Sequence, residues 1–190
     1  MNKVKNYIIK IPNNIKILYQ KQNNLLVIEG KLGKRILEFK TKLIINKIFK
    51  TIEITNIVSF SKANNEKKRI KAYRKTSLAL LKQSFLEVSI ILFKKLKLVG
   101  IGYKVIFEKI INQKFLVFKL GYSHNIYFKI PNYIKIICIK SDTILILGQS
   151  YANITQLASV IKSFKLPEPY KGKGILYDNE KIILKEGKKI

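Results

Sequence analysis

The chain has 190 residues, with 38 Lys and Arg against 11 Asp and Glu, and its formal net charge is +27 at pH 7. Its 47% hydrophobic and 11% aromatic residues exclude a disordered basic tail, because such tails lack the apolar residues that build a core. A free compact protein with this charge repels itself, so the sequence predicts a polyanion as its partner. The length suits one large domain or two small ones.

Short β-branched or aromatic runs in the first half, separated by turn residues, predict strands at residues 7–11, 15–19, 25–29, 36–39 and 48–54. A charged loop is predicted at residues 62–71, before a helix that Thr76 or Ser77 would cap. The apolar face of this helix is predicted to consist of Leu78, Leu81, Phe85 and Val88.

In the second half, similar runs predict antiparallel strands at residues 115–120, 126–130, 134–140 and 143–147. Ile154, Leu157, Ala158 and Ile161 have the spacing of one helix face. Ser150 or Asn153 can cap this helix, and Pro167 must end it, because proline lacks the backbone N–H. Strands followed by a helix, twice over, predict an α+β fold with each helix packed on one face of its sheet.

A repeat supports this division. Residues 11–17 (IPNNIKI) recur 119 residues later as residues 130–136 (IPNYIKI), and an apolar run ending in Gly30 or Gly148 follows each copy. We therefore expect an internal duplication with two similar small domains, and coincidence in an Ile- and Lys-rich chain is the weaker alternative. The expected domains are residues 1–92 and 93–175, with a basic extension at 176–190.

The sequence offers little material for catalysis or metal binding. It holds one Cys and one His, so no disulfide can form within the chain. Cys138 lies in an apolar run and is predicted to be a core residue, and His124 lies in a predicted hairpin turn without a partner acid. The motif of Gly100 and Gly102 lacks the third glycine of a dinucleotide fingerprint, so it predicts a turn or bulge instead. We expect no catalytic residues, no metal and no cofactor.

The chain is also predicted to have no membrane span, because its longest uncharged stretch, residues 143–161, is broken by polar side chains. Its first seven residues resemble neither a signal peptide nor a transit peptide, so we expect the chain to work where it is made. Abundant Lys, Ile, Asn, Tyr and Phe are typical of AT-rich coding, which points to an organelle or a reduced bacterial genome.

Residues 167–174 (PEPYKGKG) differ from the rest of the chain, because two prolines and two glycines exclude a helix or a central strand. Such a segment can lie on a phosphate backbone: Lys171 and Lys173 would supply charge, and Tyr170 would stack on a base or ribose. Gly172 and Gly174 would expose N–H donors. A flexible solvated tail explains the same residues almost equally well, and it is the better explanation for Lys185, Lys188 and Lys189.

Three motifs in order carry a resemblance to a known family: residues 98–103 (LVGIGY), 120–124 (LGYSH) and 167–174. With them the chain resembles the ribosomal protein L6 (uL6) family of the large ribosomal subunit. The resemblance implies a duplicated fold without enzymatic activity, bound mainly through its second domain to large-subunit rRNA near the sarcin–ricin loop and the elongation-factor site. It also implies neighbouring ribosomal proteins as partners. The expected location is the mitochondrion, with a plastid or an AT-rich bacterial cytoplasm as alternatives.

By position, the resemblance implies that the rRNA-binding residues are Tyr170, Lys171, Gly172, Lys173, Gly174, Lys162, Lys165 and His124. The chain departs from the usual bacterial pattern at Asn125, Leu176 and Leu166, where Pro, Arg and a basic residue are common. Residues 38–76 depart further, so the partners of the first domain are left open.

Two other functions remain open from the residues alone. An RNA-processing hydrolase would need paired acidic residues to hold a divalent metal, and the chain has two aspartates and no acidic cluster. A single-strand-binding module would use aromatic platforms, for which ten Tyr and ten Phe are available.

Overall fold

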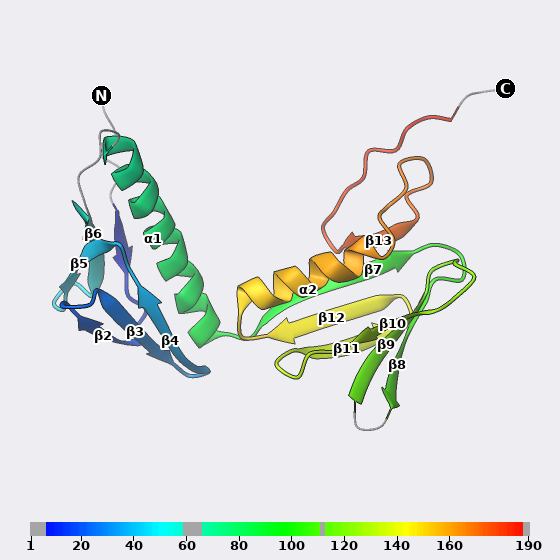
Figure 1. Ribbon diagram of the computed structural model, residues 1–190, viewed down its shortest axis with the longest axis horizontal. Coiled ribbons are helices and arrows are strands. Elements are labelled where there is room, and N and C mark those ends of the chain that lie inside the picture. Colours follow the sequence, from blue (N-terminus) through cyan, green and yellow to red (C-terminus); the bar gives the residue numbers. More distant parts are fainter. Residues whose placement is uncertain (1–6, 59–65, 111–112, 188–190) are drawn as a thin grey trace. The chain divides into compact units, whose positions relative to one another are not determined.

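The computed structural model describes residues 7–58, 66–110 and 113–187. The chain divides into two compact units, Met1–Ile91 and Leu92–Ile190, and each combines antiparallel sheets with one helix (Figure 1). The predicted α+β fold class, with two helix-bearing halves, is confirmed.

The first unit contains six strands and one helix in its described part. Their bounds are β1 Ile8–Lys10, β2 Lys16–Gln20, β3 Leu25–Gly30, β4 Gly33–Glu38, β5 Thr41–Asn46, β6 Thr51–Val58 and α1 Glu66–Ser89. Two three-stranded sheets form, with strand orders β1-β6-β5 and β2-β3-β4, and every pairing is antiparallel.

The C-terminal half of α1 packs on the sheets of this unit. Leu81, Phe85 and Val88 are buried in the same core as residues of β3 and β6, which confirms the predicted apolar face. Gly30 permits this contact, because a Cβ at that position would lie 2.5 Å from the carbonyl oxygen of Val88. The N–H of Leu32 donates to the same oxygen at 3.1 Å, so the end of the sheet is fixed to the end of the helix.

The N-terminal half of α1 corrects the sequence prediction. The helix begins at Glu66, so the predicted loop is wrong over residues 66–71, while residues 62–65 lie outside the described residues. Thr76 and Ser77 are not caps but interior positions, and the Thr76 hydroxyl donates to the carbonyl of Ala72 at 3.0 Å. Lys, Arg and Ala favour a helix. The first turns of α1 contain too few apolar residues, however, to show the apolar periodicity from which a helix is predicted.

A tertiary contact holds this charged half of α1 in place. The Arg74 guanidinium donates twice to the carbonyl oxygen of Ile54, at 3.0 and 2.8 Å, and its carbon lies 3.7 Å from the centre of the Tyr7 ring. The carbonyl of a buried residue in β6, the central strand of its sheet, thereby accepts charge-assisted hydrogen bonds. This contact between residues far apart in the sequence gave no signal in the local pattern.

The predicted strand at residues 48–54 is also wrong at its beginning. Residues 47–50 form a turn, in which Lys50 has a φ of +49° and the Asn46 side chain accepts the N–H of Ile48 at 3.1 Å. Strand β5, which precedes this turn, was not predicted. The turn contains no Gly or Pro, so nothing in the sequence separates the two strands.

The second unit contains seven strands and one helix in its described part. Their bounds are β7 Leu92–Val99, β8 Lys104–Ile110, β9 Gln113–Lys119, β10 Ile126–Lys129, β11 Lys135–Lys140, β12 Thr143–Gly148, α2 Tyr151–Ser163 and β13 Gly174–Tyr177. The sheets have orders β10-β9-β8 and β11-β12-β7-β13, again with antiparallel pairs.

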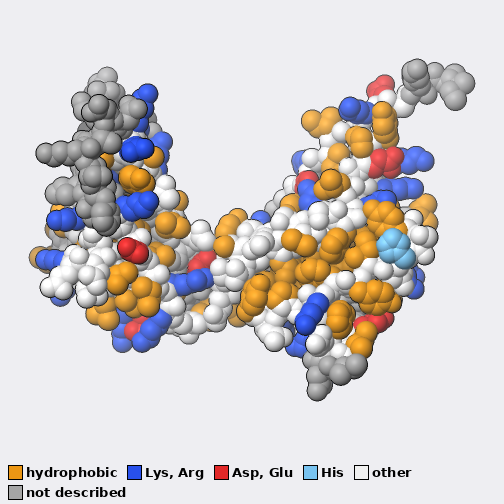
Figure 2. All heavy atoms as spheres, viewed as in Figure 1, with side chains coloured by type: hydrophobic (Ala, Val, Ile, Leu, Met, Phe, Trp, Pro, Cys, Tyr) orange, Lys and Arg blue, Asp and Glu red, His pale blue; other side chains and the backbone are white. Residues whose placement is uncertain are grey.

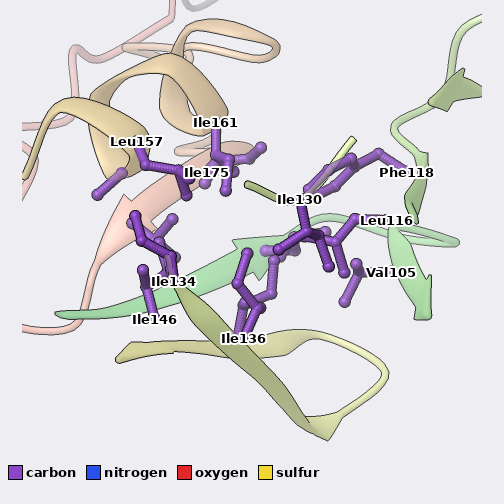
Figure 3. Close-up of a cluster of buried hydrophobic side chains, with 14 of the residues drawn as sticks. Val105, Leu116, Phe118, Ile130, Ile134, Ile136, Ile146, Leu157, Ile161 and Ile175 are labelled. Atoms are coloured by element: carbon purple, nitrogen blue, oxygen red, sulfur yellow. The ribbon is translucent and has the colours of Figure 1, made fainter. Parts of the chain in front are cut away.

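Helix α2 covers one face of the four-stranded sheet, and its buried side chains join those of both sheets in the core of this unit (Figure 3). Its buried residues are Ile154, Leu157, Ala158 and Ile161, as the spacing predicts. Ser150 occupies the N-cap position and its carbonyl accepts the N–H of Ile154 at 3.1 Å, but its side chain makes no capping bond. The helix ends at Ser163, four residues before Pro167.

The turn predicted at Gly100–Tyr103 is confirmed between β7 and β8. A Cβ on Gly100 would lie 2.8 Å from the ring of Tyr103, so the glycine makes room for that ring. Strands β7, β8 and β13 were not among the predicted strands. In β7, lysines interrupt the apolar run, although Leu96 and Leu98 are buried at alternate positions.

The sequence repeat forms the same structure in both units. Hairpins β2–β3 and β11–β12 begin with equivalent turns, in which the N–H of Ile15 donates to Pro12 and that of Ile134 to Pro131, both at 3.2 Å. Gly148 faces Ile154 of α2 as Gly30 faces α1. The connections differ, because β4, β5 and β6 precede α1 whereas α2 follows β12 directly.

Candidate nucleic-acid interface

The proline- and glycine-rich segment forms a closed loop after α2, which we call the basic loop (residues 165–174). The N–H of Glu168 donates to the carbonyl of Lys173, and the N–H of Gly172 donates to the carbonyl of Glu168, both at 2.9 Å. At the stem, the N–H of Ile175 donates to Lys165 at 2.9 Å. Three backbone bonds thus give the basic loop a defined shape.

The two glycines of the basic loop shape its backbone. Gly172 has a φ of +68°, and its N–H is already donated within the loop, so the expectation that this group is exposed to phosphate is wrong. Gly174 is buried, with a φ of +152°, and a Cβ there would lie 2.6 Å from the Cα of Pro167. Glycine at these positions lets the loop turn and return to β13.

The outer surface of the basic loop carries the groups that suit RNA. Tyr170 is 54% exposed and Lys171 is exposed, whereas Lys173 is half-buried. An exposed aromatic ring beside ammonium groups can stack on a base while the charges meet phosphates.

A second cluster adjoins the start of the basic loop. The Nζ atom of Lys165 lies 4.2 Å from the ring centre of Tyr122, whose ring stacks with that of His124 at 6.1 Å and 19°. The Tyr122 hydroxyl donates to the carbonyl of Phe164 at 3.0 Å and so fixes the β9–β10 connection to the end of α2. The structure thereby brings His124 and Lys165 together. Tyr122 was not predicted as a site residue, although it lies beside His124 in the 120–124 motif.

Lys162 is oriented away from this cluster. Its ammonium group pairs with the Glu180 carboxylate and lies 4.8 Å from the ring centre of Tyr177, and its side chain is 18% exposed. The hydrogen bond from Lys162 is the main cause that lowers the pKa of Glu180. The charge of Lys162 is therefore balanced within the chain, and the lysine fastens the segment after β13 to α2.

The C-terminal extension lies against the basic loop as far as it is described. The N–H of Lys185 donates to the carbonyl of Pro169 at 2.9 Å, and Leu184 lies beside Gly172. Asp178 pairs with Lys95 and Lys97 at 3.2 and 2.6 Å, and these bonds lower its pKa. The expected loose tail is therefore wrong for the backbone of Lys185, while Lys188 and Lys189 lie outside the described residues.

The remaining candidate groups are isolated. Cys138 is half-buried beside the core, as predicted for a structural thiol, and burial raises its pKa. Within residues 7–58, 66–110 and 113–187, no three His, Cys, Asp or Glu side chains gather where they could hold a metal ion. In the same ranges, neither helix combines the length and apolar character that crossing a membrane requires.

Comparison with known proteins identifies the fold family. The family model described as ribosomal protein L6 matches residues 99–178, from the end of β7 to the residue after β13. The large ribosomal subunit protein uL6 of Mycoplasma capricolum is 35% identical over 188 residues, which cover 99% of this chain and 98% of the relative. This chain belongs to the ribosomal protein L6 family. This family consists of structural, non-enzymatic proteins, and the range that its model matches includes the whole basic loop, residues 165–174.

Two further relatives, one named uL6 and one named uL6m, match along nearly the whole chain. The uL6 protein of Malacoplasma penetrans is 36% identical over 188 residues, covering 99% of this chain and 96% of the relative. The protein named uL6m of Reclinomonas americana is 37% identical over 185 residues, with 95% of each chain covered. The similarity to uL6 thus includes the first unit, which lies outside the region that the family model matches.

Proposed function

We propose that this chain is a structural constituent of the large ribosomal subunit that binds large-subunit rRNA through its second unit. The observation that carries this proposal is the basic loop, which is held closed and presents Tyr170, Lys171 and Lys173 on its surface. We propose that this contact lies near the sarcin–ricin loop and the elongation-factor site, as the resemblance to uL6 implies. Neighbouring ribosomal proteins are further proposed partners.

The residues of the proposed site have different roles. Lys171 and Lys173 neutralise phosphates, which dominate the affinity of proteins for nucleic acids. Tyr170 stacks on a base or ribose, and His124 with Lys165 forms a second contact beside Tyr122. Gly172, Gly174 and Lys162 act indirectly: the glycines shape the loop, and Lys162 holds the extension that packs on it.

This proposal assigns the main rRNA contact to residues 93–175 and treats residues 1–92 as a separate domain. Residues 176–190 form the extension, of which Asp178, Glu180 and Lys185 support the basic loop in its described part.

We further propose that the ribosome concerned is mitochondrial. The AT-rich coding pattern and the similarity to a uL6m protein support this location. The similarity to mycoplasma uL6 proteins favours the alternative of an AT-rich bacterial cytoplasm, and a plastid is the third candidate.

Replacing Lys171 and Lys173 by Ala tests the site. Each phosphate contact on a single strand contributes about 0.7 to the slope of log K against log salt, so the double variant should lower the slope for binding to large-subunit rRNA by about 1.4. The measurement is a binding titration at several salt concentrations.

The matched control replaces Lys109 and Lys114, which are exposed and pair with each other across the β8–β9 hairpin. This control removes the same charge away from the basic loop (Figure 1). An equal loss of slope in both double variants would mean that only net charge matters. An unchanged slope in the first variant would remove Lys171 and Lys173 from the interface.

A further inference from the structure

The first unit holds more than half of the charge. Residues 1–91 contain 20 Lys and Arg and five Asp and Glu, a net charge of +15, whereas residues 92–190 contain 18 and six, a net charge of +12. The main rRNA contact proposed above lies in the second unit. The larger share of the positive charge is therefore not yet assigned to an RNA contact.

Part of this charge lies on four lysines of α1, which we call the lysine ridge: Lys68, Lys71, Lys75 and Lys82. The spacings of three, four and seven residues place these lysines within about 60° of the helix circumference and over a length of about 21 Å. All four are exposed, and basic side chains gather over the N-terminal half of α1 (Figure 2). The ridge thus presents a straight row of positive charge.

Among the residues of the first unit whose side chains the structure describes, no acidic side chain forms an ion pair with the lysine ridge. Glu29 pairs with Lys34 at 3.2 Å, and Glu87 is buried and pairs with Arg35 at 2.8 Å. None of the four ridge lysines forms an ion pair among the described residues. Like charges three or four residues apart destabilise a helix, so an anionic partner would relieve a repulsion that the fold leaves in place.

The surface between the lysines favours a phosphate backbone over a protein. From residue 68 to residue 82, the other exposed positions on this face are Ala72 and Ala79. Short side chains leave room for a chain to approach the helix, and lysines suit phosphates as point charges. Protein interfaces, by contrast, need apolar or aromatic anchors at their centre and are depleted in Lys.

We propose that the lysine ridge binds the phosphate backbone of a second segment of large-subunit rRNA, apart from the segment bound by the basic loop. The contact is independent of base sequence, because lysine ammonium groups on phosphates read no base edges. This inference rests on the proposed rRNA binding of the second unit.

The test measures the salt dependence of binding to protein-free large-subunit rRNA from Mycoplasma capricolum. The full chain is compared with a variant in which Lys68, Lys71, Lys75 and Lys82 are all replaced by Gln. Four lost contacts at about 0.7 each should lower the slope by about 2.8. The matched control replaces four exposed lysines of the same unit by Gln: Lys10, Lys16, Lys31 and Lys42. Far-UV circular dichroism checks that each variant keeps its helices.

The outcomes separate this inference from the proposed function. A large loss of slope in the ridge variant and a clearly smaller one in the control support the ridge. Equal losses of slope in the ridge and control variants, or no loss in the ridge variant, would contradict RNA binding by the lysine ridge. Neither result would contradict RNA binding by the basic loop. Wild-type protein that binds homopolymer RNA as well as rRNA overturns the proposed function itself.

A second measurement needs no variant and guards against a ridge variant that fails to fold. Crosslinking of wild-type protein in intact large subunits should join residues 68–82 to rRNA. Crosslinks from this segment to a ribosomal protein alone would show that the ridge binds an acidic protein surface instead, and would overturn the inference.

Discussion

Gly174 fixes the point at which the basic loop returns to the sheet. A Cβ would lie 2.6 Å from the Cα of Pro167, and the φ of +152° is one that side-chain-bearing residues rarely adopt. We expect Gly174→Ala to lower the free energy of unfolding by about 2–3 kcal/mol, because backbone strain alone costs about 1–3 kcal/mol. Denaturant unfolding measures this loss. Gly187→Ala is the control, because a Cβ at that position would have no atom within 4 Å. Equal free energies of unfolding for G174A and wild type would contradict this role of Gly174.

Glu180 couples the C-terminal extension to α2 through Lys162. Because this pairing lowers the pKa of Glu180, it stabilises the folded state above the ordinary glutamate pKa of about 4.3 and is lost as the pH falls through the lowered value. We expect Glu180→Gln to destabilise the protein by about 0.5–1 kcal/mol at neutral pH and progressively less below pH 4.3.

Unfolding curves of E180Q and wild type across this pH range measure the effect. Glu186→Gln makes the same change of charge at an exposed position and should have little effect. A difference between E180Q and wild type that stays constant from neutral to acidic pH would show that the ion pair is not its cause.

Among the elements, α1 is held to its sheets by one face only, and neighbouring leucines on it have opposite environments. Leu81 is fully buried and Leu80 is 40% exposed. Truncation of a buried leucine leaves a cavity and costs about 2–5 kcal/mol, so Leu81→Ala should be severely destabilising. Leu80→Ala should cost less than about 1 kcal/mol. Similar unfolding midpoints for the two variants would contradict the packing of α1.

The elements also show what local patterns can predict. Helix α2 was predicted with its buried face, because four apolar residues at helical spacing pack against one sheet. The first turns of α1 were not predicted. Their position depends on the contacts of Arg74 with Ile54 and Tyr7, which the local sequence does not encode. Strand β13 was missed for the same kind of reason: four residues become a strand only by pairing with β7.

The candidate site was predicted in part. The prolines and glycines of residues 167–174 indicate an extended basic segment, and the structure forms it into a closed loop. That Lys162 pairs with Glu180, and that the N–H of Gly172 is used internally, depends on how the chain folds back on itself. Tyr122 is the residue that the family motif could have indicated, since it precedes His124 by two positions.

At the scale of the whole molecule, 38 Lys and Arg are spread over both units and only 11 acidic residues oppose them, which leaves a net charge of +27. Two of these acids, Asp178 and Glu180, pair within the second unit and fasten the extension beside the basic loop. The internal pairs therefore order the loop and leave Lys171 exposed for RNA. A chain with this net charge requires a folded, polyanionic partner, as a member of the uL6 family has in a ribosomal subunit.

The most direct test of this claim is to separate the ribosomal subunits of the source cells on a gradient and to crosslink the large-subunit fraction. We predict that the chain co-sediments with the large subunit and that Tyr170 to Gly174 crosslink to rRNA. Co-sedimentation with mitochondrial rather than bacterial or plastid subunits would support the proposed location. Absence of the chain from every large-subunit fraction, or crosslinks to rRNA that exclude residues 170–174, would contradict the account.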